Sequence, residues 1–175
     1  YGSEKSFRTQ KVLVAAKIAK KDVVLAGEKP PHDKFPMGVT PALEDDKVCL
    51  FGAEACSHHL AGDSLKATNC AEVIQWMQWA EGRLLPNVLG YVLPSVSVAK
   101  IDSEVVEEAR NELLAQLKAF NEMLLTRTYL VGERMSFADI CVAMDLLPAF
   151  QYVLDDSARA GLKNVTRWFR TIVNH

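Results

Sequence analysis

Ser136 and Asp139 are the two side chains whose types and spacing most resemble a catalytic pair, because a carboxylate near a serine hydroxyl could support nucleophilic chemistry. The same Ser-x-x-Asp spacing is that of a capping box, in which each side chain bonds the main-chain amide of the other where a helix begins. Met135 and Ile140 occupy the two positions of a hydrophobic staple. The spacing therefore favours a structural role, and we expect the loss of either cap residue to destabilise the fold by about 1 kcal/mol.

A metal site is the second arrangement to consider, because His58 and His59 lie near Cys49 and Cys56 in the sequence. Neighbouring positions on a helix point about 100° apart, so the two imidazoles cannot face one ion. The four cysteines include no Cys-x-x-Cys pair, which argues against a zinc site and against a disulfide framework. We expect no metal, and we expect mostly buried free thiols in a reducing, cytosolic compartment.

Trp76 and Trp79 lie three residues apart and so share one face of a predicted helix. Few basic residues surround them, which argues against stacking on nucleic-acid bases. Such a pair is typical of a packed core or of an interface anchor, and burial in the core is the commoner case. The carboxylates at positions 104, 107 and 108 predict a solvated helix face.

Composition and charge exclude several classes of protein. With 49% apolar and 24% charged residues, the 175-residue chain can form a hydrophobic core, so it is not intrinsically disordered. Its net charge of -2 provides no basic field to attract a phosphate backbone, so we expect no direct nucleic-acid partner. No apolar run approaches the length of a membrane span, and no signal peptide is evident. Because the chain begins with Tyr1 and its last helical pattern runs to His175, we expect a fragment of a longer chain.

The first part of the chain alternates helical and strand-like patterns. Helical spacing predicts a helix over residues 5–20, and a short apolar run predicts a buried strand over 22–26. Crowded prolines and glycines then exclude a regular helix as far as residue 38. Two short strands, 39–43 and 48–51, flank a turn at 45–47 and predict a hairpin, followed by a helix over 53–60 that ends at Gly62.

The second part reads as helix throughout. The patterns predict helices over 67–83, stopped by Pro86, over 103–125, from Ser136 onward, and from Val165 to the end. We therefore predict an α/β part over residues 1–62 and an all-helical part over 67–175. No glycine-rich phosphate loop occurs in either.

The order of these parts, with a proline before the hairpin and a Ser-x-x-Asp box in the helical part, resembles the glutathione transferase fold. Three strings narrow the resemblance: KFPMGVTPALE at 34–44, TRTYLVGER at 126–134 and NVTRWF at 164–169. They are similar to the N-terminal domain of the gamma subunits of eukaryotic elongation factor 1. This resemblance implies a thioredoxin-like first half, with its first strand truncated before Tyr1, and a helical second half.

The resemblance also implies roles for particular residues. Thr40 and Pro41 would form a cis peptide bond beside a glutathione-sized cleft. In glutathione-binding members a Glu-Ser or Gln-Ser pair holds the γ-glutamyl group, and the matching positions here are Gly52 and Ala53, so we expect no cofactor. The thiol-activating hydroxyl of such enzymes lies where the first helix begins. Ser3 and Ser6 are the candidates for it, and each is more simply explained as a helix N-cap.

Three functions follow from the resemblance. The first is a cytoplasmic scaffold domain of the elongation factor 1 complex that anchors the guanine-nucleotide exchange subunits. The second is an active glutathione transferase or peroxidase. The third is a domain appended to a valyl-tRNA synthetase, which would place an aminoacyl-tRNA synthetase among the partners. Retention on immobilised glutathione would identify the second, and continuation into a nucleotide-binding fold would identify the third.

Overall fold

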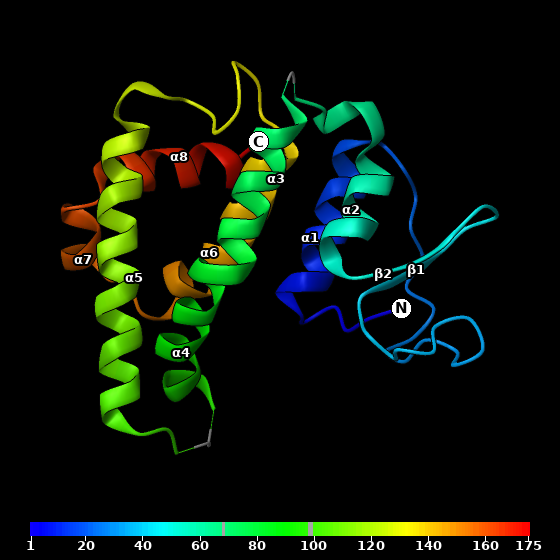
Figure 1. Cartoon of the computed structure of the whole chain (residues 1–175), viewed down its shortest axis with the longest axis horizontal. Coiled ribbons are helices and arrows are strands. Elements are labelled where there is room, and N and C mark those ends of the chain that lie inside the picture. The colour runs from blue at the N-terminus through cyan, green and yellow to red at the C-terminus, as the bar shows by residue number, and fades with distance from the viewer. Residues whose placement is uncertain (68, 98–99) are drawn as a thin grey trace. The chain divides into compact units, whose positions relative to one another are not determined.

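A computed structural model describes residues 1–67, 69–97 and 100–175, and it divides into two compact units, Tyr1–Ala67 and Thr68–His175 (Figure 1). The first unit is mixed α and β, and the second is all-helical within its described residues. Sequence patterns placed the change from mixed to helical structure between residues 62 and 67.

The first unit packs two helices together beside a hairpin (Figure 1). Its elements are α1 (Phe7–Ile18), β1 (Ala42–Glu44), β2 (Cys49–Phe51), α2 (Ala53–Ala61) and a 3-10 turn (Gly62–Leu65). The strands are antiparallel, with Ala42 opposite Phe51 and Glu44 opposite Cys49. Val12 and Ala16 of α1 meet Ala53, Cys56 and Leu60 of α2 in the core, and Leu43 and Leu50 pack against them.

The buried strand predicted over residues 22–26 is not formed. Val24 is 85% exposed, and among the described residues no strand pairs with this segment. A strand needs a neighbouring strand to which its main chain hydrogen-bonds. Next to this segment, the Gly2 amide donates to the Gly27 carbonyl at 2.8 Å, but this bond is not part of a strand pairing. The prediction was wrong because an apolar run shows that a segment can be buried, not that a neighbour pairs with it.

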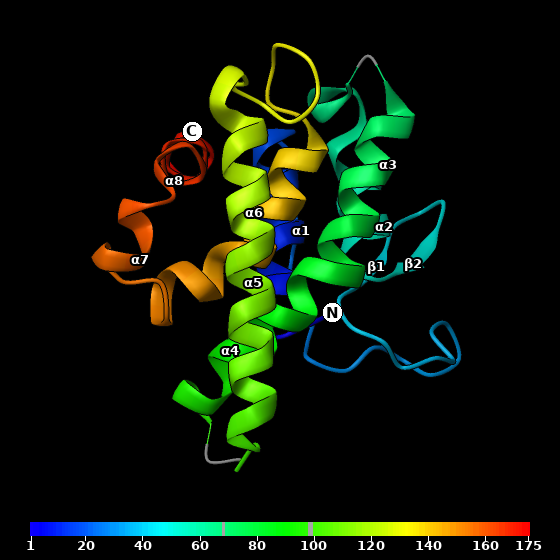
Figure 2. The ribbon, with the colours of Figure 1, turned by 60° about the vertical axis from the view of Figure 1, so that its left-hand side comes forward.

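The second unit is built around α6 (Phe137–Tyr152), which is buried on nearly every side (Figure 2). Before it come α3 (Cys70–Trp79), a π-helical turn (Ala80–Leu84), α4 (Leu85–Val96), α5 (Ser103–Met123) and a 3-10 turn (Leu124–Thr126). After it come α7 (Asp156–Ala160) and α8 (Lys163–Val173). Helices α3, α4 and α8 pack on α6, and α5 packs on α4 and α8.

Pro86 does not stop the helix that precedes it, contrary to the prediction. It is the second residue of α4 and follows the π-helical turn Ala80–Leu84, where the α-helical hydrogen-bond pattern is already interrupted. The chain therefore passes from α3 through the π-helical turn into α4 and remains helical on both sides of the proline.

Gly90 sets the approach of α4 to α5. A Cβ atom at this position would lie 2.8 Å from the Cβ of Ala109, closer than two carbon atoms can approach. The glycine therefore lets the two helix backbones come together where any larger residue would push them apart.

Two of the four cysteines differ from the prediction of mostly buried thiols. Cys56 and Cys141 are buried, but Cys49 and Cys70 are exposed, and none of the four forms a disulfide among the described residues. Cys49 lies on the open side of a two-stranded hairpin and Cys70 is the first residue of α3, so neither position is covered.

No helix in the described part of the chain is long and apolar enough to cross a bilayer.

Candidate functional site

The Thr40–Pro41 peptide bond is cis, as the resemblance implied. Pro41 is buried directly before β1, and Thr40 is exposed. The Pro41 carbonyl accepts the Gly52 amide hydrogen at 2.9 Å, and the Cys56 thiol lies 3.8 Å from the same oxygen. These contacts hold the start of β1 against the start of α2.

Gly52 and Ala53 lie where glutathione-binding relatives would carry the pair that holds the ligand. Gly52 is the N-cap of α2 and has a φ of 89°, a backbone conformation that favours glycine. Ala53 is buried. Neither residue offers a carboxylate or a hydroxyl, and each hydrogen bond to a charged ligand group that is lost lowers affinity by about 1.5–3 kcal/mol.

Ser6 is the N-cap residue of α1 by backbone geometry, but its hydroxyl makes no capping hydrogen bond. The main chain closes the first turn instead: the Ser6 carbonyl accepts from Gln10 at 2.9 Å, and the Ser6 amide donates to Ser3 at 3.0 Å. The expected N-cap position is therefore confirmed for Ser6, without the side-chain bond that usually accompanies it.

A cavity of about 540 Å³ lies in the first unit, and Pro41 is the one candidate residue that lines it. Its walls are the segment 23–26 on one side and residues 42–46 on the other, above Thr9 and Val12 of α1. At one end, Tyr1 exchanges two main-chain hydrogen bonds with Ala42, of 2.7 and 2.9 Å, as paired antiparallel residues do. The cavity does not gather Ser3, Ser6, Thr40, Gly52 or Ala53 around one ligand.

Cys56 at the floor of this cavity is a protonated thiol at neutral pH. Burial raises its pKa to about 11, and its hydrogen points to the Leu50 carbonyl at 3.5 Å. A thiol must ionise to act as a nucleophile, so this position does not support thiolate chemistry.

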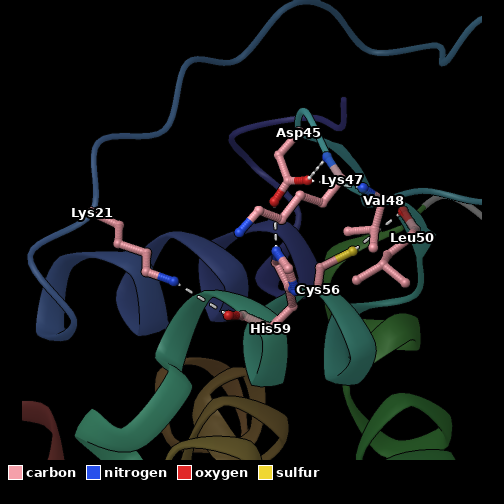
Figure 3. A network of polar contacts seen from close by, with 7 residues as sticks. All are labelled: Lys21, Asp45, Lys47, Val48, Leu50, Cys56 and His59. Atoms are coloured by element: carbon pink, nitrogen blue, oxygen red, sulfur yellow. Dashed lines mark hydrogen bonds and ion pairs between the residues drawn. The ribbon is translucent and has the colours of Figure 1, made fainter.

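Asp45 and His59 form a polar link between the hairpin and α2 (Figure 3). Asp45 Oδ1 accepts the amide hydrogens of Lys47 and Val48 at 2.8 and 2.9 Å, and Oδ2 lies 2.6 Å from His59 Nε2. The amide of Lys47, then His59 and the amide of Val48, lower the pKa of Asp45 to about 2. The turn at residues 45–47 was predicted from the sequence, but the link to His59 was not. The sequence did contain a signal for the contacts of Asp45 with Lys47 and Val48, because an aspartate that begins a tight turn often accepts main-chain amide hydrogens.

Ser136 and Asp139 form the expected capping box and are almost completely buried, which excludes a substrate from them. Asp139 Oδ2 accepts from the Ser136 amide and from the Ser136 hydroxyl, both at 2.9 Å. Oδ1 accepts from the Leu130 amide and from Trp168 Nε1, also at 2.9 Å. Burial raises the pKa of Asp139, and these donated hydrogen bonds oppose the rise. The contacts to Leu130 and Trp168 were not predicted.

Residues 84–175 match the glutathione S-transferase C-terminal domain family, and the capping box lies within this match. The chain belongs to this family. The division into a mixed and a helical unit is the architecture of the glutathione transferase fold, and it confirms the fold class inferred from the sequence.

Curated proteins with high sequence identity to this chain include elongation factor 1-gamma proteins. The chain is 60% identical over 174 residues, 99% of its length, to a probable elongation factor 1-gamma of Caenorhabditis elegans, of which it covers 42%. It is 39% identical over 144 residues, 80% of its length, to an elongation factor 1-gamma of Danio rerio, of which it covers 33%. The chain thus spans less than half the length of these relatives, and the resemblance stated from its sequence strings is confirmed.

Solved structures confirm the glutathione transferase fold. The glutathione S-transferase-like domain of elongation factor 1-gamma from Saccharomyces cerevisiae superposes with a TM-score of 0.82 at 21% identity, covering 99% of this chain and 88% of that one. Glutathione S-transferase I bound to lactoylglutathione superposes with a TM-score of 0.85 at 23% identity, covering 100% and 93%. At these identities the superpositions establish the fold alone.

Proposed function

We propose that this chain is the glutathione-transferase-like domain of an elongation factor 1 gamma subunit, and that it anchors a guanine-nucleotide exchange subunit in the elongation factor 1 complex of the cytosol. The observation that carries the proposal is the 60% identity to a probable elongation factor 1-gamma along 99% of the chain. The same relationship favours this role over that of a domain appended to a synthetase.

A scaffold role is supported by what the candidate ligand site lacks. Gly52 and Ala53 provide no side chain for the γ-glutamyl end of glutathione, and the Cys56 thiol stays protonated. The one candidate residue at the cavity, Pro41, contributes a carbonyl that Gly52 and Cys56 already contact. A domain that keeps the fold without the ligand-holding side chains acts through its surface, and it needs no cofactor for that.

Complex formation tests the proposal directly. The chain is mixed with the purified exchange subunit, and the mass is measured by light scattering at low and at high salt. We expect a complex at both salt concentrations, because a net charge of -2 gives little long-range steering. Absence of a complex at both concentrations would overturn the scaffold role.

Glutathione transferase activity is the outcome that would replace the scaffold role. Retention of the chain on immobilised glutathione, with conjugating activity that disappears in Ser3→Ala or Ser6→Ala, would make this domain an enzyme.

A further inference from the structure

The second unit carries an aromatic hollow of about 380 Å³ between α3 and α5. We use the name aromatic hollow for the space lined by Gln75, Trp76, Trp79, Gln116, Ala119, Phe120 and Met123. No residue of the candidate glutathione site belongs to it, and the proposed function has so far given it no role.

The floor of the hollow is a rigid cluster of rings. Trp76 and Trp79 of α3 meet edge to face, with centroids 5.5 Å apart, and each reaches Phe120 of α5, at 5.7 and 5.4 Å. Phe120 contacts Trp168 at 5.2 Å, and Trp168 is held by its hydrogen bond to Asp139. The hollow therefore rests on the buried core through a continuous chain of ring contacts.

The walls of the hollow are open to a partner. Trp76 and Trp79 are only half-buried, contrary to the commoner expectation of a core pair, while Gln75 and Ala119 are exposed at the rim. Tryptophans packed against other rings lose little side-chain entropy on binding, and tryptophan is enriched among interface residues that dominate affinity.

Gln116 adds an unsatisfied polar atom beside the rings. Its Nε2 donates to the Arg83 carbonyl at 3.5 Å, but its Oε1 is buried without a hydrogen-bond partner among the described residues. A buried acceptor without a donor is unfavourable, so Gln116 is a polar group of the hollow that the described residues leave unsatisfied.

Charges around the hollow are mostly negative. Three or four residues from its lining residues lie three carboxylates, Glu72, Glu112 and Glu122, and among the described residues two guanidinium groups, Arg83 and Arg127. Three carboxylates against two guanidinium groups leave a small excess of negative charge, which favours a partner with lysine or arginine beside an apolar side chain.

We propose that the aromatic hollow is the docking site of the exchange subunit, and that it receives one large apolar side chain flanked by lysine or arginine from a segment of that subunit. This inference rests on the proposed function. It adds the surface, the unit of the chain that carries it and the chemistry of the segment that binds.

Filling the hollow tests the proposal. Ala119→Arg places a long cation at the exposed rim, where it occupies the hollow and repels a basic segment. Asn111→Arg is the matched control, because position 111 is exposed on the same helix and is turned well away from the lining residues. By calorimetric titration with the exchange subunit, Ala119→Arg should weaken binding by at least about tenfold, and the control should leave it within about twofold.

A second variant, on the opposite wall of the hollow, keeps the test valid if Ala119→Arg fails to fold. Gln75→Arg changes an exposed residue of α3, and it should weaken binding as Ala119→Arg does while the circular dichroism and the unfolding temperature stay those of the unmodified chain. If the unmodified chain binds and both folded variants bind equally well, the docking site is wrong and the scaffold function stands. If the unmodified chain does not bind, the scaffold function itself fails and the docking site fails with it.

Discussion

Asp139 accepts four hydrogen bonds although no solvent reaches it, and this makes it a structural residue and not a catalytic one. The four donors come from Leu130, Ser136 and Trp168, so a single carboxylate joins the loop before α6, the start of α6 and the middle of α8. A serine near an aspartate invites a catalytic interpretation, but burial and partner geometry decide against it. The Asp139 carboxylate therefore stabilises the fold through its hydrogen bonds.

The first prediction concerns that network. Ser136→Ala should lower the free energy of unfolding by about 1 kcal/mol, as the loss of a helix cap does. Asp139→Ala should lower it by at least about 3 kcal/mol, more than a cap alone, because it leaves three buried N–H groups without an acceptor. Urea titration of the single and double variants measures both values. In the Asp139→Ala background, Ser136→Ala should have a much smaller effect, and strict additivity would show that the two residues do not share a network.

The second prediction uses the lowered pKa of Asp45. Its pKa of about 2 lies below the usual aspartate value of 3.8, so its contribution to stability is complete above about pH 4 and is lost as the pH falls toward 2. Asp45→Asn should therefore be less stable than the unmodified chain near neutral pH, and the gap should close between about pH 4 and pH 2. Urea midpoints across this range measure it. Asp46→Asn, a neighbouring exposed position outside the link, should show no such convergence, and a gap for Asp45→Asn that stays constant with pH would contradict the assignment.

Among the elements, the contact between α4 and α5 depends on one small residue. Gly90 faces Ala109 where the two helices are closest, so this crossing has no room for a side chain. Between α3 and α5, by contrast, a hollow remains, and Trp76 and Trp79 contact Phe120 across it.

The third prediction compares two helical glycines. Gly90→Ala inserts a methyl group 2.8 Å from Ala109; overpacking of this kind lowers stability by about 1–3 kcal/mol, and the gain in helix propensity returns about 1 kcal/mol. We expect a net loss of up to about 2 kcal/mol in thermal or urea unfolding. Gly82→Ala is the control: nothing lies within 4 Å of its new methyl group, so it should be neutral or stabilising. Equal effects at the two positions would show that α4 and α5 can separate freely.

The long helices could be predicted because their patterns repeat over several turns. The apolar residues of α5 at Leu113, Leu117 and Phe120 recur on one face, and the Ser-x-x-Asp box marks the start of α6. The strand expected at 22–26 and the stop expected at Pro86 failed for a common reason. Both depend on neighbours, a pairing strand in one case and the position of proline within a helical turn in the other, and a local pattern does not contain them.

The candidate site was predicted only where local chemistry defines it. Gly52 and Ala53 could be identified as lacking ligand-binding side chains once the family resemblance placed them at the ligand-holding positions. The Asp45–His59 link and the Trp168 bond to Asp139 join residues 14 and 29 positions apart, and no spacing rule in a single sequence indicates such pairs.

On the scale of the whole molecule, the glutathione transferase fold is present, and Gly52 and Ala53 offer no side chain that would hold glutathione. The fourth prediction is therefore weak or absent glutathione binding in calorimetry. A dissociation constant in the low micromolar range, lost in Ser3→Ala or Ser6→Ala, would show that the serines and the main chain suffice without the Glu-Ser pair.

The central claim is that this chain works through its surface and not through a glutathione site. The measurement that tests it most directly is a calorimetric titration of the exchange subunit into the chain, carried out with and without a large excess of glutathione. We predict a saturable interaction whose affinity is the same in both titrations. No detectable binding, or binding that glutathione displaces, would contradict the claim.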